Sequence, residues 1–301
     1  MNSICLQCPR ACGVDRERTV GFCGVPQGFR VARAAKHMWE EPSISGKNGS
    51  GTVFFSGCNL RCIFCQNRVI SHERMGHALT DTQLTDLFLR LQDAGVHNIN
   101  LVTPTHYALQ LAKLLPKVKS RLHIPIVYNC GGYEAVETLR QLDGLIDIYL
   151  PDIKYFSTSL SKRYSAAEDY FPVARRALTE MLRQQTEPRL DADGMMVGGV
   201  MVRHLVLPSH RADSVALLDA LAKEFGNKAF WLSLMSQYTP QFAKDAPYPN
   251  LHRRVTTFEY QTVADHAASL GFDGYFQERA SANAAYTPDF YEESFLPKAD
   301  P

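Results

Sequence analysis

The sequence lacks several features that would assign it to a broad class of protein. Its 301 residues carry a formal net charge of only +1, which gives neither the basic surface of a nucleic-acid-binding protein nor a strong attraction to anionic membranes. No apolar run reaches the length of a membrane span, and Cys5 precedes any hydrophobic stretch that could serve as a signal peptide. We therefore expect a cytoplasmic protein that neither binds nucleic acid nor enters a membrane.

What is present is an ordinary globular composition with an uneven distribution of cysteine. Hydrophobic residues make up 45% and charged residues 21% of the chain, and its length suffices for one large α/β domain with a short extension. The eight cysteines fall into a group of four near the start, a group of three, and Cys130 alone. Cysteines at such short spacings in a chain without an expected secretion signal indicate bound metal rather than disulfide bonds.

The group of three is a C-x3-C-x2-C run that directly follows a short apolar segment, and it consists of Cys58, Cys62 and Cys65. Three closely spaced thiolates can ligate three irons of a cubane [4Fe–4S] cluster and leave the fourth iron open to a small molecule. The alternatives are a zinc site with a distant fourth ligand and buried core thiols. Zinc sites usually contain a second cysteine pair, and none follows closely after Cys65, so the spacing favours the cluster.

The group of four has the spacing C-x2-C-x3-C-x10-C and consists of Cys5, Cys8, Cys12 and Cys23. Four thiolates complete either an all-cysteine zinc site or a second [4Fe–4S] cluster. Few apolar residues lie between them, so metal would have to organise this segment. Pro9 leans slightly toward a cluster, because bacterial ferredoxin motifs also place proline after a cysteine. Both metals remain open.

From residue 51 onward, short β-type runs alternate with amphipathic segments of helical length. The expected strands are 52–56, 98–103, 125–129, 145–150, 200–207 and 229–236. The expected helices are 81–94, 107–115, 134–142, 166–184, 213–225 and 258–270. A weaker run at 30–36 is consistent with a short strand or hairpin arm, and Tyr275 with a closing strand. Such alternation predicts parallel βαβ units.

The predicted fold is therefore α/β: a partial (β/α)6 barrel over residues 51–301, with residues 1–50 as a small metal-binding extension and linker. In β/α barrels the chemistry lies at the carboxyl ends of the strands. Polar residues at these ends are binding-site candidates, although each one alone is equally consistent with a solvated loop or, for His106, a structural histidine. They are Thr103, Thr105, His106, Asn129, Asp152, Lys154, Arg203 and Gln237.

The order of these motifs resembles the radical S-adenosylmethionine (SAM) superfamily, whose barrels have this partial form. Within it, the chain looks most like proteins related to pyruvate formate-lyase activating enzyme that carry an N-terminal cysteine segment. The resemblance is carried by the three-cysteine loop with Phe64 and Asn67, by Pro151-Asp152-Ile153-Lys154, and by Arg203-His204-Leu205-Val206-Leu207-Pro208. It adds Phe64 and Asn67 to the binding-site candidates.

The resemblance implies a [4Fe–4S] cluster, bound SAM, and a reductant such as flavodoxin or ferredoxin. Reductive cleavage of SAM would yield a radical that abstracts hydrogen from a protein or peptide, with a glycyl radical enzyme as one candidate. The alternatives are a radical SAM enzyme acting on a small metabolite and a non-catalytic iron–sulfur or zinc protein.

Two motifs depart from the family pattern. Thr103-Pro104-Thr105-His106 stands where a Gly-Gly-Glu motif usually holds the amino group of SAM, and Tyr128-Asn129-Cys130-Gly131 matches only the Asn and Gly of an Asp-Thr-Asn-Gly element. The ferredoxin-like insert of many activating enzymes is also missing after Cys65. The resemblance therefore extends to the fold and to SAM chemistry more firmly than to the substrate.

Overall fold

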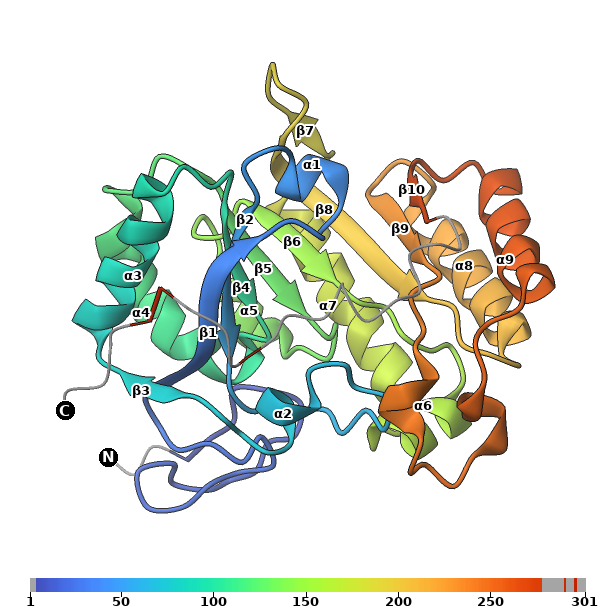
Figure 1. Ribbon diagram of the computed structural model, residues 1–301, viewed down its shortest axis with the longest axis horizontal. Helices are drawn as coiled ribbons and strands as arrows, with labels where there is room; N and C mark the ends of the chain where they lie inside the picture. The colour runs from blue at the N-terminus through green and yellow to red at the C-terminus, as the bar shows by residue number, and fades with distance from the viewer. Residues whose placement is uncertain (1–3, 278–289, 291–294, 297–301) are drawn as a thin grey trace.

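The computed structural model describes residues 4–277, 290, 295 and 296. In this part of the chain, strands of one open sheet run in the order β10-β9-β8-β6-β5-β4-β2-β1-β3, and β7 pairs with β8 (Figure 1). The strands are β1 Phe29–His37, β2 Ser50–Phe55, β3 His77–Leu79, β4 Ile99–Val102, β5 Ile126–Cys130, β6 Ile148–Pro151, β7 Arg189–Leu190, β8 Met196–Leu205, β9 Trp231–Met235 and β10 Gly274–Phe276.

The six strands expected from the sequence are β2, β4, β5, β6, β8 and β9. They are adjacent in chain order, and every neighbouring pair among them is parallel. The expected closing strand near Tyr275 is β10, which pairs in parallel with β9. An α/β fold with an open sheet, consistent with a partial barrel, is thereby confirmed.

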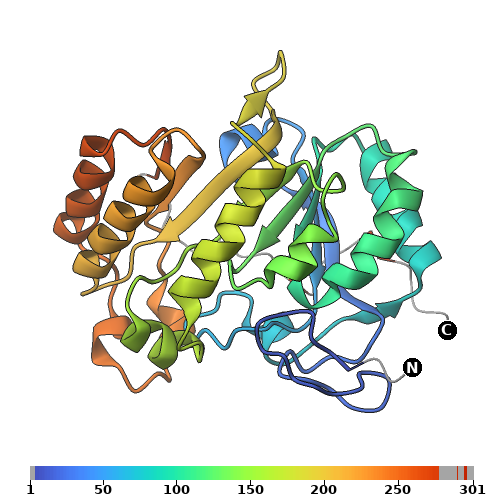
Figure 2. The same ribbon diagram turned by 180° about the vertical axis from the view of Figure 1, so that it is seen from behind.

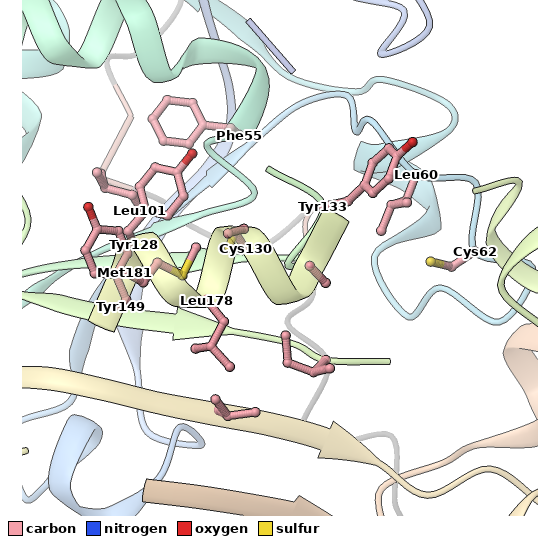
Figure 3. Packing of buried hydrophobic residues seen from close by; sticks show 14 of the residues in the cluster. Phe55, Leu60, Cys62, Leu101, Tyr128, Cys130, Tyr133, Tyr149, Leu178 and Met181 are labelled. Atoms are coloured by element: carbon pink, nitrogen blue, oxygen red, sulfur yellow. The ribbon is translucent and has the colours of Figure 1, made fainter. Parts of the chain in front are cut away.

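The helices are α1 Pro42–Ser45, α2 Arg68–Ser71, α3 Asp81–Asp93, α4 Ala108–Lys119, α5 Val136–Arg140, α6 Thr158–Ser165, α7 Tyr170–Gln184, α8 Arg211–Phe225 and α9 Thr257–Ser269. The longer ones lie along one face of the sheet (Figure 2). Tyr128 and Tyr149 of the sheet gather there with Met181 of α7, and all three are fully buried (Figure 3). No helix of the described residues is long and apolar enough to span a bilayer.

Local sequence signals explain where several elements begin and end. Thr80, the expected N-cap, accepts a hydrogen bond from the backbone N–H of Gln83, and the Gln83 side chain accepts one from the backbone N–H of Thr80. This capping box begins α3 at the predicted residue, Asp81. The helical structure expected within 166–184 is confirmed by α7. The sequence analysis expected no helix at α6, because only Leu160 and Tyr164 mark an apolar face in that serine-rich segment.

The N-terminal segment contributes more to the sheet than the sequence suggests. β1 runs antiparallel to β2, with His37 opposite Ser50 at the start of β2, and it extends the run expected at 30–36 by one residue at each end. The chain then turns into α1 beside the amino ends of the strands, opposite the three-cysteine loop (Figure 1). Segment 38–45 therefore lies at the amino-terminal end of the parallel strands, although the sequence analysis expected only a linker there.

Ile44 of α1 closes the barrel interior at the amino ends of the strands. Its side chain is fully buried in a separate apolar cluster with Val127, Ile148, Leu150, Met196 and Met201. Val127 and Ile148 sit opposite one another in β5 and β6, so this cluster lies on the inner face of the sheet. The short helix therefore gives the barrel interior a closed base.

We expect Ile44→Ala to lower the free energy of unfolding by about 2–5 kcal/mol, because it leaves a cavity in a closed apolar cluster. Denaturant unfolding of the reconstituted protein measures the change. Leu190→Ala is a suitable control, since Leu190 is 45% exposed in β7 and its truncation should cost less than about 1 kcal/mol. Equal losses in the two variants would contradict the assignment of Ile44 to the barrel base.

Candidate functional site

The three-cysteine loop leaves β2 at the carboxyl edge of the sheet. Gly57 begins it with a positive φ of 84°, and a Cβ atom there would lie 2.8 Å from the carbonyl oxygen of Cys23. Glycine thus lets the loop turn while the N-terminal segment packs directly against it. Cys58, Cys62 and Cys65 then all line a single cavity over the inner face of the sheet.

Hydrogen-bond donors surround the three sulfur atoms. The backbone N–H of Leu60 donates to Cys58 Sγ at 3.3 Å, the Ser165 hydroxyl lies 3.0 Å from Cys62 Sγ, and the Ser71 hydroxyl lies 3.3 Å from Cys65 Sγ. Such donors stabilise cluster-bound thiolates and tune the cluster potential. Their presence at all three positions fits an iron–sulfur cluster better than three inert core thiols.

The thiols also need a positive partner to ionise. Burial raises the pKa of Cys58 to about 12 and that of Cys65 to about 11, and in both cases the neighbouring Cys62 raises it further. Cluster irons would supply the charge that displaces these protons. No three His, Cys, Asp or Glu side chains in the described ranges converge on one metal ion. In a cubane cluster each thiolate ligates a different iron, so that closer convergence is not required.

The structure brings eight of the ten predicted binding residues to this cavity. They are Phe64, Asn67, Thr103, Asn129, Asp152, Lys154, Arg203 and Gln237. They come from the cysteine loop and from the carboxyl ends of β4, β5, β6, β8 and β9, as expected for a β/α barrel. Thr103 adopts a φ of 59° directly after β4, which is unusual for a β-branched residue and marks a constrained turn at the cavity wall.

Thr105 and His106, predicted with the same group, lie outside the cavity in the buried 3-10 helix Thr105–Tyr107. His106 Nε2 lies 2.7 Å from the carbonyl oxygen of Ser56, and burial lowers the pKa of its ring to about 3. Its own carbonyl accepts hydrogen bonds from Gln7 and Arg16. These contacts anchor the N-terminal segment to the sheet.

Asp152 and Lys154 form an ion pair in the same cavity, near Cys62. Lys154 Nζ lies 2.5 Å from Asp152 Oδ2, and both side chains are mostly buried. Burial alone would lower the pKa of Lys154, but Asp152 and the nearby Cys62 outweigh it and raise that pKa. The ammonium group is therefore a fixed positive charge beside the cysteine loop.

Two carboxylates that the sequence analysis missed lie deeper in the cavity. Arg203 donates to Glu41 through Nε at 2.8 Å and through Nη2 at 2.5 Å, and Nη2 also contacts Glu40. Burial opposes ionisation of Glu41, but Arg203 outweighs it and lowers the pKa of that carboxyl. Both glutamates precede the predicted barrel. The only sequence signal for this site was that Glu40 and Glu41 are adjacent and stand between the expected short strand at 30–36 and Pro42.

The four N-terminal cysteines lie in a loop docked against the three-cysteine loop. Two arginines contact the Phe22 ring of this loop. The guanidinium carbons of Arg10 and Arg61 lie 3.9 and 4.5 Å from the centre of that ring. Arg61 also donates to the Cys58 carbonyl and contacts the Phe22 carbonyl. The cation–π and hydrogen-bond contacts fix the two cysteine-containing loops side by side.

Within this N-terminal loop, Cys8 is buried and electrostatically coupled to Cys5 and Cys12. Burial raises the pKa of the Cys8 thiol to about 12, and nearby Glu134 and these two thiols raise it further. The backbone N–H of Phe22 donates to Cys12 Sγ at 3.3 Å. Soft thiolates suit both iron and zinc, but in the described part of the chain no three of these cysteines converge on one position for a single ion.

Glu134 is a buried carboxyl group between the N-terminal loop and the sheet. It accepts hydrogen bonds from Thr105 at 2.6 Å and Tyr128 at 3.0 Å. Burial nevertheless raises its pKa to about 7. The folded protein thus retains a proton between about pH 4.5 and 7 that the unfolded chain has lost, so stability falls as the pH rises through this range.

We expect Glu134→Gln to remove this pH dependence. We compare the free energy of unfolding of the variant with that of the native protein at each pH. This difference should be about 2–3 kcal/mol more in favour of the variant at pH 8 than at pH 5. Denaturant titrations at the two pH values measure the difference. Glu137→Gln is the control, because Glu137 is exposed in the same segment. If the native protein and Glu134→Gln shift in parallel, the carboxyl does not titrate in this range.

An open α/β sheet with a three-cysteine loop at its carboxyl edge defines a partial β/α barrel with a candidate metal-binding loop. Residues 52–197 match the family model described as the Radical SAM superfamily. The matched segment begins within β2 and contains the three-cysteine loop, and proteins of that superfamily bind a [4Fe–4S] cluster and SAM. The residues that line the cavity fit both.

One relative is the uncharacterized protein MJ0674 of Methanocaldococcus jannaschii, 28% identical over 279 residues, with 89% of this chain and 75% of the relative covered. The crystal structure of Streptococcus suis SuiB bound to precursor peptide SuiA is similar with a TM-score of 0.50 and 13% identity over 79% of this chain. This chain spans about half of SuiB, 51%. Methylornithine synthase (PylB) gives a TM-score of 0.49 and 16% identity over 81% of this chain and 73% of its own.

Proposed function

We propose that this protein is a radical SAM enzyme that binds its cluster at Cys58, Cys62 and Cys65 and SAM in the cavity below. The observation that carries the proposal is the convergence of three hydrogen-bonded cysteines and eight predicted polar or aromatic residues on one cavity. When bound, the cluster and SAM supply a radical able to remove a hydrogen atom from a substrate.

The residues of the chain would position SAM and exclude water. The Lys154 ammonium, a fixed cation beside the cysteines, suits the carboxylate of the methionine moiety. Thr103 and Asn129 offer hydrogen bonds at the adjoining strand ends, where the usual Gly-Gly-Glu motif is replaced. Phe64, Leu205 and Met235 add apolar surface suited to the adenosine moiety.

For the substrate we propose a protein or peptide, with a glycyl radical enzyme as one candidate. The sequence motifs shared with activating enzymes support this choice. The similar crystal structure of SuiB, in which that protein is bound to a precursor peptide, is in keeping with it. A reductant such as flavodoxin or ferredoxin would supply the electron.

A small metabolite is the second candidate, and one observation favours it. The barrel base is closed by Ile44 and the apolar cluster around it, so the cavity ends in a floor rather than in a through-passage. Turnover experiments with deuterated candidate substrates, one a peptide and one a small metabolite, would distinguish the two. The true substrate is the one that transfers deuterium to 5′-deoxyadenosine.

Anaerobic reconstitution with iron and sulfide, followed by SAM and dithionite, tests the activity itself. We expect 5′-deoxyadenosine and methionine in equal amounts, formed only when protein, SAM and reductant are all present. A fully reconstituted cluster that yields no 5′-deoxyadenosine would contradict the enzyme proposal and favour a non-catalytic metal protein.

We also propose that Cys5, Cys8, Cys12 and Cys23, within the extension assigned to residues 1–50, hold a second [4Fe–4S] cluster, with structural zinc as the alternative. The direct contact between this extension and the three-cysteine loop supports the cluster, since it places a second metal close to the first. A metal there could pass electrons inward or simply organise the loop.

A further inference from the structure

The C-terminal turn of α6 holds the three-cysteine loop on both sides of Cys62. The backbone N–H of Arg61 donates to the carbonyl oxygen of Ser165 at 3.1 Å, and the backbone N–H of Ile63 donates to that of Tyr164 at 2.9 Å. The last carbonyl groups of a helix have no partner within the helix, so the loop supplies the donors that they lack. These two bonds fix the backbone of Cys62 against the end of α6.

A pair of buried hydroxyl groups leads from this turn to the sulfur of Cys62. Ser165 Oγ lies 3.0 Å from Cys62 Sγ and 2.7 Å from the hydroxyl oxygen of Tyr155. Ser165 is fully buried and Tyr155 is 1% exposed, so water does not compete for their hydroxyl groups. Among the described residues, neither hydroxyl group has another hydrogen-bond partner. We call Tyr155 and Ser165 the hydroxyl relay.

The direction of both hydrogen bonds follows from the protons that are available. A sulfur that ligates iron carries no proton, so Cys62 would accept and the Ser165 hydroxyl would donate. The oxygen of Ser165 can then only accept the proton of the Tyr155 hydroxyl. Burial raises the pKa of Tyr155, and the nearby Cys62 raises it further, so this hydroxyl keeps its proton and remains a donor.

The other two sulfur atoms of the loop have longer contacts with their donors. Cys58 Sγ accepts from the backbone N–H of Leu60 at 3.3 Å. Cys65 Sγ lies 3.3 Å from the hydroxyl of Ser71, which is also 2.9 Å from His72 Nδ1. The contact made by the hydroxyl relay is the shortest of the three, and successive hydrogen bonds in a dry interior strengthen one another.

We infer that the hydroxyl relay raises the reduction potential of the cluster at the three-cysteine loop, with Ser165 and Tyr155 as positioning residues that act through Cys62. The inference rests on the proposed function in that it takes these cysteines to be cluster ligands. Hydrogen bonds to a ligating sulfur stabilise the reduced form, which carries more negative charge. The hydroxyl relay therefore makes the cluster easier to reduce by an external one-electron donor.

Redox titration of the anaerobically reconstituted protein, followed by electron paramagnetic resonance, tests the inference. Titrations without and with SAM identify the cluster that has an open iron, because its signal should change when SAM binds. In Ser165→Ala, we expect the ratio of reduced to oxidised cluster at a fixed potential to fall about tenfold, a shift of about 59 mV to more negative values. Tyr155→Phe weakens the relay without removing the donor to sulfur, so the ratio should fall by about threefold.

Ser161→Ala is the matched control. Ser161 is also a buried serine of α6, 1% exposed, but its hydroxyl donates to the carbonyl oxygen of Thr158 at 3.1 Å. The variant should keep the potential of the native protein. If Ser165 contributed only to packing, Ser165→Ala would change the stability of the protein and leave the potential where Ser161→Ala leaves it.

An unchanged potential in folded, iron-loaded Ser165→Ala or Tyr155→Phe would overturn the inference. If Ser165→Ala does not fold or does not take up iron, Tyr155→Phe decides, because it keeps the aromatic ring and the serine hydroxyl in place. A native protein without a SAM-sensitive cluster would contradict the proposed function. A native protein that has such a cluster, with variants that do not shift its potential, would contradict only the role of the hydroxyl relay.

Discussion

Cys62→Ala is expected to remove the cluster at the three-cysteine loop and to reduce 5′-deoxyadenosine formation to the uncatalysed level. Cys62 is buried beside Ser165 and lines the cavity together with Cys58 and Cys65. Loss of one of three protein ligands should cost about four irons per chain. Iron and sulfide analysis, electron paramagnetic resonance of the reduced protein, and product formation measure the effect.

Cys130→Ala is the matched control. Cys130 is also a buried cysteine at the cavity wall, but it ends β5 and lies outside both cysteine groups. The variant should keep its iron content and its reduced-cluster spectrum. Iron retained in Cys62→Ala, or lost in Cys130→Ala, would show that the cluster ligands have been assigned incorrectly.

The combined change Cys5→Ser and Cys8→Ser is expected to remove a second group of about four irons while the first cluster remains. The N-terminal loop has little apolar core, so the loss should also loosen its contacts through Phe22 and Arg61 and lower the melting temperature. Metal analysis and calorimetry of the reconstituted variant measure both changes.

The control for this experiment is Arg18→Ala, an exposed residue in the same loop whose contact with Asp15 is a surface ion pair. It should alter neither the metal content nor the melting temperature. Unchanged iron together with the loss of one zinc per chain would contradict the second cluster and establish a structural zinc site.

The parallel core of this fold could be predicted because its signals are local. Apolar runs alternating with amphipathic segments located all six inner strands, and the Thr80 capping box located the start of α3. The same reasoning missed α6 and α1. α6 has too few apolar residues to show a period, and α1 is a single turn whose only large apolar residue, Ile44, is buried by distant strands.

The candidate site was predictable to the extent that barrel geometry places strand ends together. Asp152, Lys154 and Asn129 lie at the ends of strands visible in the sequence, and the structure brings them to one cavity. His106 also follows a strand, but the 3-10 turn after Pro104 directs its ring away from the cavity to the carbonyl oxygen of Ser56. Glu40 and Glu41 could not be found this way, because they reach the cavity from its other end and their partner Arg203 is 162 or more residues distant.

That long-range pairing has a consequence for the order in which the protein can fold. Residues 4–45 are synthesised before the strands that they contact: β1 pairs with β2, the closed base requires β5, β6 and β8, and Glu41 pairs with Arg203. Contacts of such wide sequence separation form late and slowly, since a long loop has to close before they contribute. Until β8 has been added, the closed base around Ile44 is incomplete. The three-cysteine loop of the partly synthesised chain can then be approached from the amino ends of the strands, a route that is closed in the complete fold.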